Sequence, residues 1–426
     1  MKNNLIFLYS KSKLFLVIVA ILYKLSLEFT YINFIYIYYE HNYFYLNTNH
    51  IKYFESWFFF LLFIRLSPHS YLKPSDFFVN FFLYIFIAPL LVYYSFNNSD
   101  RLCLYIILGN LLLIYLFRTT KKIKIPTFSK SYAFIFLISV SVILIVLFSL
   151  FIKADFQWFN LDPKKVYVFR EHTDIIFNYN VFAYLNAWSF KVFGIFFLII
   201  FLIEKKYFKL FLIFLLYLIW FGFFNHKFIL FMPFVVLFFY ILFNKKNDFT
   251  IFVTLLLFLI CIFYALYLFT DEIFYTSLII RRIFFIPPML TFKYLEFFSE
   301  NGFIYWSDSV LSGLIEYKYT ISPQKIIGEY IQTNSHANNS FISSGYMHAG
   351  VYGVFLYTLV FKLILWIIDS CSHGKKSNLI VTSIIIIPMI SLMLNSDLPT
   401  SLLTHGILIS IVIIVLLNKK LKTYDL

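Results

Sequence analysis

Charged residues are scarce in this chain of 426 residues: Asp, Glu, Lys and Arg together make up 13%, whereas hydrophobic residues make up 61%. In soluble globular proteins about a quarter of the residues are charged and about half are apolar. A compact soluble fold of this length cannot bury so much apolar surface while it leaves so few charges for its exterior. The composition therefore excludes a soluble protein and predicts that the chain lies in a membrane.

Cysteines and the common cofactor motifs are also nearly absent. Cys103, Cys261 and Cys371 are far apart and have no CxxC spacing, so they predict neither a disulfide framework nor a zinc site. The sequence has no GxxxxGKS/T or GxGxxG loop, which disfavours nucleotide hydrolysis. It has no HExxH and no other histidine pair with the spacing of metal ligands. We therefore expect no metal and no cofactor.

Long apolar runs recur along the whole chain. A helix that crosses a bilayer needs about 20 mostly apolar residues. By this measure the sequence predicts an all-α polytopic integral membrane protein, a single membrane domain over 1–426, with about twelve transmembrane helices at 14–38, 51–66, 77–95, 102–117, 131–152, 181–203, 208–224, 227–243, 249–270, 346–368, 379–395 and 403–418. Lys24 and Glu28 lie inside the first span at positions i and i+4, where a pair shares one helix face.

The net charge of +14 follows the connections between these spans. With the N-terminus in the cytoplasm, the short outer connections hold only four basic residues, Lys52, Arg101, Lys191 and Lys227. The inner connections hold twenty: Lys2, Lys11, Lys13, Arg65, Lys73, Arg118, Lys121, Lys122, Lys124, Lys130, Lys205, Lys206, Lys209, Lys245, Lys246, Lys375, Lys376, Lys419, Lys420 and Lys422. This positive-inside pattern predicts that both termini are cytoplasmic. This pattern accounts for the net positive charge, so the charge does not indicate an acidic partner such as a nucleic acid.

Two connections are long, 153–180 and 271–345, and both fall on the outer side. The second contains apolar stretches such as 283–298, which are too hydrophobic for a disordered segment. We expect short helices at the outer membrane–water boundary that cap a cavity between the spans. The membrane interior has almost no ionisable residues apart from Lys24, Glu28 and Lys362, which favours chemistry at the outer face over ion-coupled transport.

Two adjacent arginines, Arg281 and Arg282, lie near the beginning of the second long loop, after Asp271 and Glu272. Each guanidinium can fork onto two oxygens of a phosphate, so the pair is a candidate site for a lipid-linked phosphate. The alternatives are arginines that snorkel to the phosphates of the bilayer, or ion pairs with Asp271 and Glu272.

A second cluster closes the same loop and enters the next span. His336, Asn338 and Asn339 carry side chains that can hydrogen-bond sugar hydroxyls. His348 follows inside the span, where the alternative is a satisfied histidine within the bundle.

Two smaller clusters lie elsewhere on the predicted outer face. Arg170 and Glu171 belong to the first long loop, where a solvated charged stretch is the alternative. His226 and Lys227 form a tight hairpin between two apolar spans, and contact with lipid headgroups alone would explain Lys227.

Several short motifs follow one another over most of the chain: Pro74-Ser75-Asp76, Val166-Tyr167-Val168-Phe169-Arg170, His226-Lys227, Arg281-Arg282-Ile283-Phe284-Phe285-Ile286-Pro287, Tyr305-Trp306-Ser307-Asp308-Ser309, and Ala337-Asn338-Asn339-Ser340-Phe341-Ile342 with Gly350 and Gly353. In this order they resemble the O-antigen and capsular polysaccharide repeat-unit polymerases of bacterial inner membranes.

The resemblance implies a membrane glycosyltransferase that joins oligosaccharide units carried on undecaprenyl diphosphate, at the outer face of the inner membrane. Its partners would be the lipid-linked oligosaccharide, membrane lipid, a chain-length regulator protein and a flippase. For the leaving diphosphate we expect Arg281, Arg282, Arg170 and Lys227, because cations stabilise charge that develops in the transition state.

The same resemblance suggests a general base and contacts to the sugars. His336 is the first choice as base for the attacking hydroxyl, followed by His348, Glu171 and Asp308, and sugar contacts are expected from Asn338, Asn339, Tyr305 and Trp306. Two other functions remain open. A lipid-linked oligosaccharide flippase would need a polar cavity within the bundle, and an O-antigen ligase would perform the same displacement with another acceptor.

Overall fold

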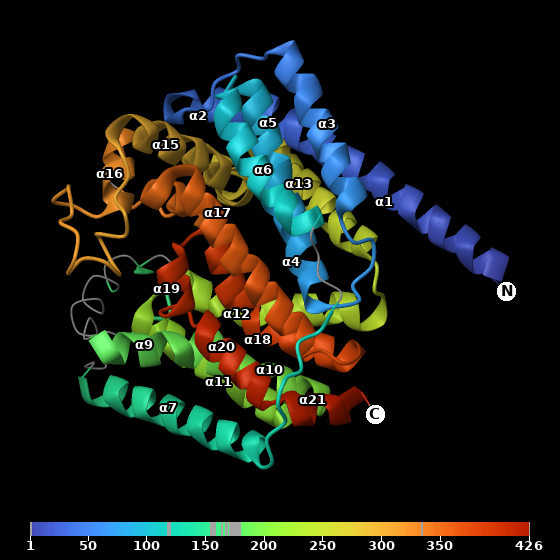
Figure 1. The fold of residues 1–426 in the computed structure, drawn as a ribbon, viewed down its shortest axis with the longest axis vertical. Coiled ribbons are helices and arrows are strands. Elements are labelled where there is room, and N and C mark those ends of the chain that lie inside the picture. The colour runs from blue at the N-terminus through green and yellow to red at the C-terminus, as the bar shows by residue number, and fades with distance from the viewer. Residues whose placement is uncertain are drawn as a thin grey trace.

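The computed structural model describes residues 2–116, 121–153, 159–162, 165–166, 169, 180–333 and 335–425. Within these residues eleven helices are long and apolar enough to cross a membrane. They are Lys13–Asn42, Pro74–Phe96, Ser131–Ile152, Val181–Ile203, Tyr207–Phe224, Lys227–Lys245, Phe249–Thr270, Ile273–Asn301, Phe341–Ser370, Lys375–Leu394 and Leu398–Leu416. The expected all-α fold of a multi-pass membrane protein is confirmed (Figure 1).

Several spans are divided by π-helical turns or by breaks. The α-helices are α1 (Lys2–Thr30), α2 (Tyr36–Tyr39), α3 (His50–Leu66), α4 (Pro74–Phe82), α5 (Ala88–Phe96), α6 (Arg101–Leu116), α7 (Ser131–Lys153), α9 (Asn180–Trp188), α10 (Gly194–Ile203), α11 (Tyr207–Phe224), α12 (Lys227–Lys245), α13 (Phe249–Thr270), α14 (Ile273–Thr276), α15 (Ile286–Asn301), α16 (Pro323–Tyr330), α17 (Phe341–Ser370), α18 (Lys375–Leu394), α19 (Leu398–Leu402), α20 (Ile407–Leu416) and α21 (Asn418–Asp425). The π-helical segments are η1 (Tyr31–Ile35), η3 (Leu83–Ile87), η5 (Ser189–Phe193) and η6 (Ser277–Phe285), and η2 (Glu40–Asn42) is a 3-10 turn.

The helices match the predicted spans except that two of them are shorter than a membrane-spanning helix and one further membrane-length helix is present. The predicted spans 51–66 and 102–117 are the shorter helices α3, with 17 residues, and α6, with 16 residues. The other ten predicted spans correspond to membrane-length helices. The structure adds one such helix, Ile273–Asn301, which sequence analysis had assigned to a loop.

The second long connection is therefore different from the expectation of short helices over 271–345. A single helical stretch of 29 residues occupies Ile273–Asn301, because aromatic and aliphatic residues dominate it and Pro287 and Pro288 fall in the first turn of α15, where proline is tolerated. In the described part of 302–345, α16 is a short helix of the expected kind. α15 and α16 lie on the side of the molecule away from both termini (Figure 1).

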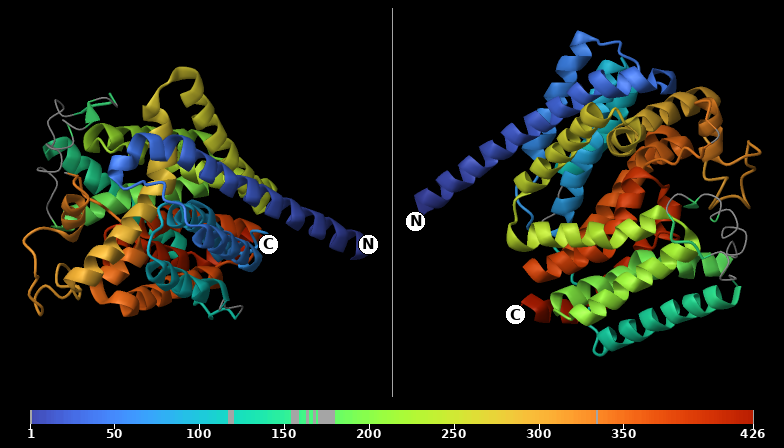
Figure 2. Two further views of the ribbon diagram at one scale, coloured as in Figure 1. Left: turned by 90° about the horizontal axis from the view of Figure 1, so that it is seen from above. Right: turned by 180° about the vertical axis from the view of Figure 1, so that it is seen from behind.

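Both termini lie at one side of the molecule (Figures 1 and 2). Predicted cytoplasmic connections meet there, since Lys73 pairs with Asp369 at 2.8 Å and the backbone N–H of Lys376 donates to the carboxylate of Asp425. Lys122 also donates to the carbonyl of Ser372. The basic connections are thus gathered on one face, and the assignment of that face to the cytoplasm stays a prediction.

A buried ion pair joins the first span to α3. Lys24 and Glu28 form the expected i,i+4 pair, and both side chains are buried. Lys24 also donates to Ser56 Oγ at 3.2 Å and lies 3.9 Å from the centre of the Trp57 ring, while the Tyr53 hydroxyl donates to Glu28 at 3.1 Å. Among the described residues, the partners Ser56, Trp57 and Tyr53 all come from α3, so the pair holds α1 against α3 within the apolar region.

Breaking this pair is expected to destabilise the protein. Lys24→Met leaves the Glu28 carboxylate buried without its cation, and such a change costs about 3 kcal/mol or more. The double variant Lys24→Met/Glu28→Leu removes both charges and should recover most of the loss. Unfolding in detergent, followed by circular dichroism, measures both variants. A single variant as stable as the wild type would contradict this reading.

Candidate functional site

A cavity of about 620 Å³ opens on the side of the molecule away from the termini. Its lining comes from the end of the first span, from η6 and α15, from the segment before α17 and from the end of α18: Asn42, Tyr43, Arg281, Arg282, Ile286, Met289, Leu290, Ile331, Thr333, Ser335, His336, Ala337, Asn338 and Asn395. Four residues that sequence analysis selected therefore face one space, namely Arg281, Arg282, His336 and Asn338.

The arginines are supplied by the π-helical segment η6. The Arg281 guanidinium carbon lies 4.1 Å from the centre of the Tyr39 ring, and its Nε donates to Ser277 Oγ at 2.9 Å. These contacts fix the plane of the guanidinium, whereas Arg282 is exposed at the cavity. π-Helical turns frequently occur at functional sites, because the extra residue redirects side chains.

The ion-pair alternative for these arginines does not hold in the structure. Asp271 and Glu272 are exposed at the end of α13, and in the described part of the chain neither arginine is within ion-pair distance of a carboxylate. Two adjacent cations without a neighbouring described acid give the cavity a positive wall. A phosphate or diphosphate is the ligand that such a wall attracts.

Buried and exposed side chains alternate along the segment before α17, and the exposed ones are His336 and Asn338. Ala337 and Asn339 are buried, while His336 and Asn338 are exposed and line the cavity. The Ala337 N–H donates to the Gln324 carbonyl at 2.9 Å, and the Ala337 carbonyl accepts from the Tyr294 hydroxyl at 2.8 Å. These two bonds hold the backbone between α15 and α16, so that the side chains on either side of Ala337 point into the cavity.

Two further contacts complete the anchoring of this segment. A Cβ at Gly328 of α16 would lie only 2.1 Å from the Ser335 carbonyl oxygen, so only glycine permits this close approach. Asn339 accepts from the backbone N–H of Ser340 at 2.7 Å and lies 3.4 Å from the Thr291 hydroxyl. Asn339, which we had expected to contact sugar, thus packs against α15 and is not among the residues that line the cavity.

His348 belongs to a second, buried cluster. Its Nε2 lies 3.0 Å from Asp397 Oδ2, and its Nδ1 lies 3.2 Å from the backbone nitrogen of Trp306. The Trp306 ring stacks on the imidazole with 5.0 Å between centres and donates through Nε1 to the Tyr357 hydroxyl at 2.7 Å. Asp308 Oδ1 is 4.0 Å from His348 Nδ1. The cluster therefore combines three predicted residues with Asp397 and Tyr357, which sequence analysis missed.

A break in α17 creates this cluster. Ala349 and Gly350 leave the helical conformation, and Gly350 has φ of +58°, where its missing Cβ would also approach Phe303 to 2.6 Å. The backbone N–H groups of Ile304 and Tyr305 donate to the carbonyls of Met347 and His348 at 3.1 and 3.0 Å. The loop that follows α15 thus satisfies the carbonyls freed by the break, which keeps Tyr305 half exposed and Trp306 on the histidine.

The hydrogen bonds assign the protonation of His348. Its Nδ1 accepts from the Trp306 backbone N–H, so the ring proton is on Nε2 and is donated to Asp397. Neither nitrogen is left to take a proton from a substrate. Burial raises the pKa of Asp308, and the charge of Asp397 acts in the same direction. We therefore interpret the cluster as a set of contacts that stabilise the break in α17. The exposed His336 remains the candidate base.

The remaining predicted residues lie elsewhere. His226 is half-buried and Lys227 is exposed at the turn between α11 and α12, and neither lines the cavity. Beside them Asn225 is buried and accepts from the Asn160 side chain at 2.9 Å. Arg170 and Glu171 lie outside the described residues.

Tyr39, Asn395 and Asp397 were not among the predicted site residues. Tyr39 is one of many tyrosines at the end of an aromatic span, so nothing distinguishes it in the sequence. Asn395 is the last residue of the predicted span 379–395, and Asp397 falls between that span and the next one, 403–418. A carboxylate between two long apolar runs is a signal for a buried polar site, and it could have been used.

Comparison with known proteins adds no relative. The chain matches no family model, no curated protein and no solved structure.

Proposed function

We propose that this protein polymerises undecaprenyl-diphosphate-linked oligosaccharide repeat units into O-antigen or capsular polysaccharide. The observation that supports the proposal is the cavity that holds Arg281, Arg282 and His336 together, on the side away from the basic connections. Its lining is also amphipathic, because Ile286, Met289, Leu290 and Ile331 adjoin the polar residues. Such a lining suits a substrate with a charged diphosphate and a polyprenyl tail.

The chemical step is a displacement at the anomeric carbon of one lipid-linked chain. The terminal hydroxyl oxygen of a second lipid-linked unit forms a bond to that carbon. The bond from the carbon to the diphosphate oxygen breaks, and its electron pair stays on the diphosphate. The hydroxyl proton passes to the imidazole of His336. Arg281 and Arg282 stabilise the negative charge that grows on the leaving group, which is larger in the transition state than in the bound substrate.

The location of this reaction is part of the proposal. With both termini in the cytoplasm, the cavity opens at the outer face of a bacterial inner membrane, where a flippase delivers the lipid-linked units and a chain-length regulator protein limits the product. Asn338 would hydrogen-bond the sugar next to His336, since it faces the same cavity.

Reconstitution tests the proposal directly. The purified protein in proteoliposomes receives undecaprenyl-diphosphate-linked units extracted from the bacterium that encodes it, and the products are separated on a gel. A ladder of polymer supports the proposal. Transport of the units across the vesicle without polymer would identify a flippase and overturn it. Transfer that occurs only to a different acceptor would identify a ligase.

His336→Ala is expected to lower polymer formation about 100-fold, because the attacking hydroxyl loses its general base. The side chain is exposed, so the unfolding midpoint should not change. His50→Ala is the matched control, since His50 is another exposed histidine that does not line the cavity. A variant with full polymer output would remove His336 from the mechanism and leave the cavity without a base.

A further inference from the structure

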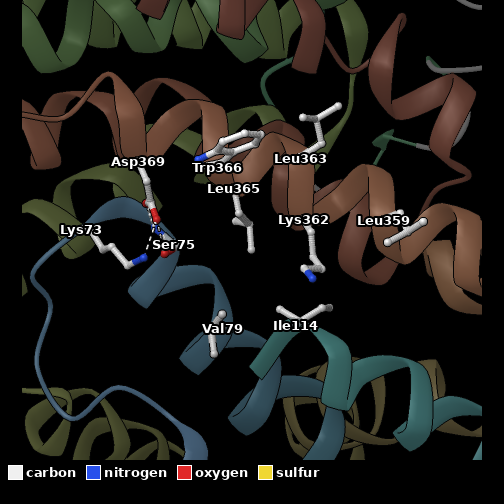
Figure 3. Close-up of a pocket in the computed structure, with 10 residues that line it drawn as sticks. All are labelled: Lys73, Ser75, Val79, Ile114, Leu359, Lys362, Leu363, Leu365, Trp366 and Asp369. Atoms are coloured by element: carbon white, nitrogen blue, oxygen red, sulfur yellow. Dashed lines mark hydrogen bonds and ion pairs between the residues drawn. The ribbon is translucent and has the colours of Figure 1, made fainter. Parts of the chain in front are cut away.

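Two cavities outside the candidate site differ in how their polar groups are used. One of them, of about 230 Å³, lies between α4, α6 and α17 (Figure 3). Its carboxylate, Asp369, accepts from the Ser75 backbone N–H at 2.8 Å and from the Ser75 hydroxyl at 2.7 Å, and it pairs with Lys73 at 2.8 Å. These contacts join the start of α4 to the end of α17, so the polar end of this cavity serves the packing of the helices.

The other cavity lies between the end of α5, the start of α6 and the second half of α15, and we call it the α15 cavity. Its volume is about 290 Å³. It is lined by Tyr93, Asn97, Ser99, Asp100, Cys103, Phe292, Lys293, Glu296, Ser299 and Glu300. The proposed displacement assigns no role to any of these residues.

The α15 cavity adjoins the cavity of the candidate site. Helix α15 lines both, with Leu290 in the candidate site and Lys293 in the α15 cavity. Tyr43 lines the candidate site, its ring centre lies 4.5 Å from Lys293 Nζ, and its carbonyl accepts from the Tyr93 hydroxyl at 2.9 Å. From Leu290 to Glu296, α15 rises about 9 Å. An extended ligand held at the candidate site would therefore reach the α15 cavity.

The charge of the α15 cavity is opposite to that of the candidate site. Asp100, Glu296 and Glu300 bring three carboxylates, and the single lysine of the lining, Lys293, pairs with Glu296 at 2.8 Å. A lining of this charge repels a diphosphate. Among the described residues, no three His, Cys, Asp or Glu side chains are placed to hold a metal ion, so the geometry does not favour a metal either.

The lining is rich in hydrogen-bond acceptors and has an aromatic floor. Asp100 and Glu300 are exposed at the cavity. Ser99 Oγ is buried and has no hydrogen-bond partner among the described residues, although both backbone polar groups of Ser99 are hydrogen-bonded. A buried hydroxyl without a partner costs free energy, which a ligand that supplies the partner recovers. The rings of Tyr93 and Phe292, 5.7 Å apart between centres, form the floor.

We propose that the α15 cavity binds sugar residues of the lipid-linked oligosaccharide whose diphosphate lies at Arg281 and Arg282. Sugar hydroxyls are donors that match the acceptors Asp100, Glu300 and Ser99, and the apolar face of a sugar ring packs on the aromatic floor. An uncharged sugar is not repelled by the carboxylates. The inference rests on the proposed function for the identity of the ligand, and it adds the place where the sugars of that ligand are held.

Saturation-transfer difference NMR on the full-length protein in detergent tests the inference. The probe is the repeat-unit oligosaccharide released from its carrier by mild acid hydrolysis, which lacks the diphosphate and so reports on sugar binding alone. The wild type should give a signal, and Ser99→Ala should weaken the binding about fivefold, the effect of one neutral hydrogen bond. The unfolding midpoint of Ser99→Ala should not fall, because the Ser99 hydroxyl has no partner in the described part of the chain.

Glu300→Ala should weaken the binding about tenfold, since hydrogen bonds to a charged group are stronger. Glu329→Ala is the matched control, because Glu329 is an exposed carboxylate on α16 that lines neither cavity, and it should bind as the wild type does. Excess inorganic diphosphate should leave the sugar signal in place, because the negative lining of the α15 cavity does not attract it.

Three results would overturn the inference: no signal with the wild type, binding unchanged in both Ser99→Ala and Glu300→Ala, or displacement of the oligosaccharide by diphosphate. The polymer assay separates this failure from a failure of the proposed function. Oligosaccharide binding that depends on Ser99 and Glu300, without polymer from the reconstituted protein, would overturn the polymerase and support the sugar site. Polymer formation with binding unaffected by either variant would overturn the sugar site alone.

Discussion

Arg281→Ala and Arg282→Ala are each expected to reduce polymer formation about 100-fold, as the loss of a preorganised charge at a leaving group does in other enzymes. Both side chains line the cavity beside His336, and no described carboxylate pairs with them. The diphosphate would gain negative charge during the displacement, so the loss should fall on the rate of the chemical step more than on substrate binding.

The two arginines should differ when lysine replaces them. Arg281 stacks on Tyr39 and is fixed through Ser277, so its planar group is oriented before the substrate binds. Lysine can neither stack in this way nor fork onto two oxygens, and Arg281→Lys should remain nearly as inactive as Arg281→Ala. Arg282 is exposed, and Arg282→Lys should keep part of the activity.

Polymer output in the reconstituted system measures these variants. Lys325→Ala is the matched control, because Lys325 is an exposed cation on α16, close to the same segment, that does not line the cavity. Full activity of both alanine variants would show that the arginines meet only bilayer phosphates, which was the alternative that sequence analysis left open.

The membrane fold could be predicted from the sequence because a helix that crosses lipid must be apolar over a fixed length. The same criterion missed the helix Ile273–Asn301, which was assigned to short helices at the outer membrane–water boundary and which contains Arg281 and Arg282. The structure accommodates both arginines by a π-helical segment that turns them toward one cavity. Such a local change of helix type depends on tertiary contacts, such as the Tyr39 ring, that no sequence period reveals.

Most residues of the candidate site could be predicted from the sequence, but which of them lie together in the structure could not. Arg281, Arg282, His336 and Asn338 stood out as polar residues in an apolar chain, and they share the cavity. His348 stood out for the same reason, but only the structure shows that both of its nitrogens are occupied. Its acceptor, Asp397, is 49 residues away, and no local pattern joins the two.

Asp397→Ala is expected to destabilise the protein by about 3 kcal/mol. The variant leaves the buried Nε2 proton of His348 without an acceptor, which costs about 1–3 kcal/mol. It also removes the N-cap of α19, where Asp397 accepts from the Leu398 N–H at 2.7 Å, and a lost cap adds about 1 kcal/mol. Unfolding in detergent measures the change. Stability equal to that of the wild type would contradict the role of the pair as an anchor.

The variant His348→Gln distinguishes between two roles of His348, a structural contact that stabilises the fold and a catalytic base. Glutamine retains a side-chain N–H that can reach Asp397, so the folded fraction of this variant should keep most of its polymer formation while the unfolding midpoint falls. His336→Ala should show the opposite pattern, with the midpoint unchanged and the activity lost. A His348→Gln protein that is as stable as the wild type yet inactive would mean that His348 acts on the substrate. In that case the buried cluster, and not the cavity at His336, would hold the base, and Asp397 would be its orienting partner.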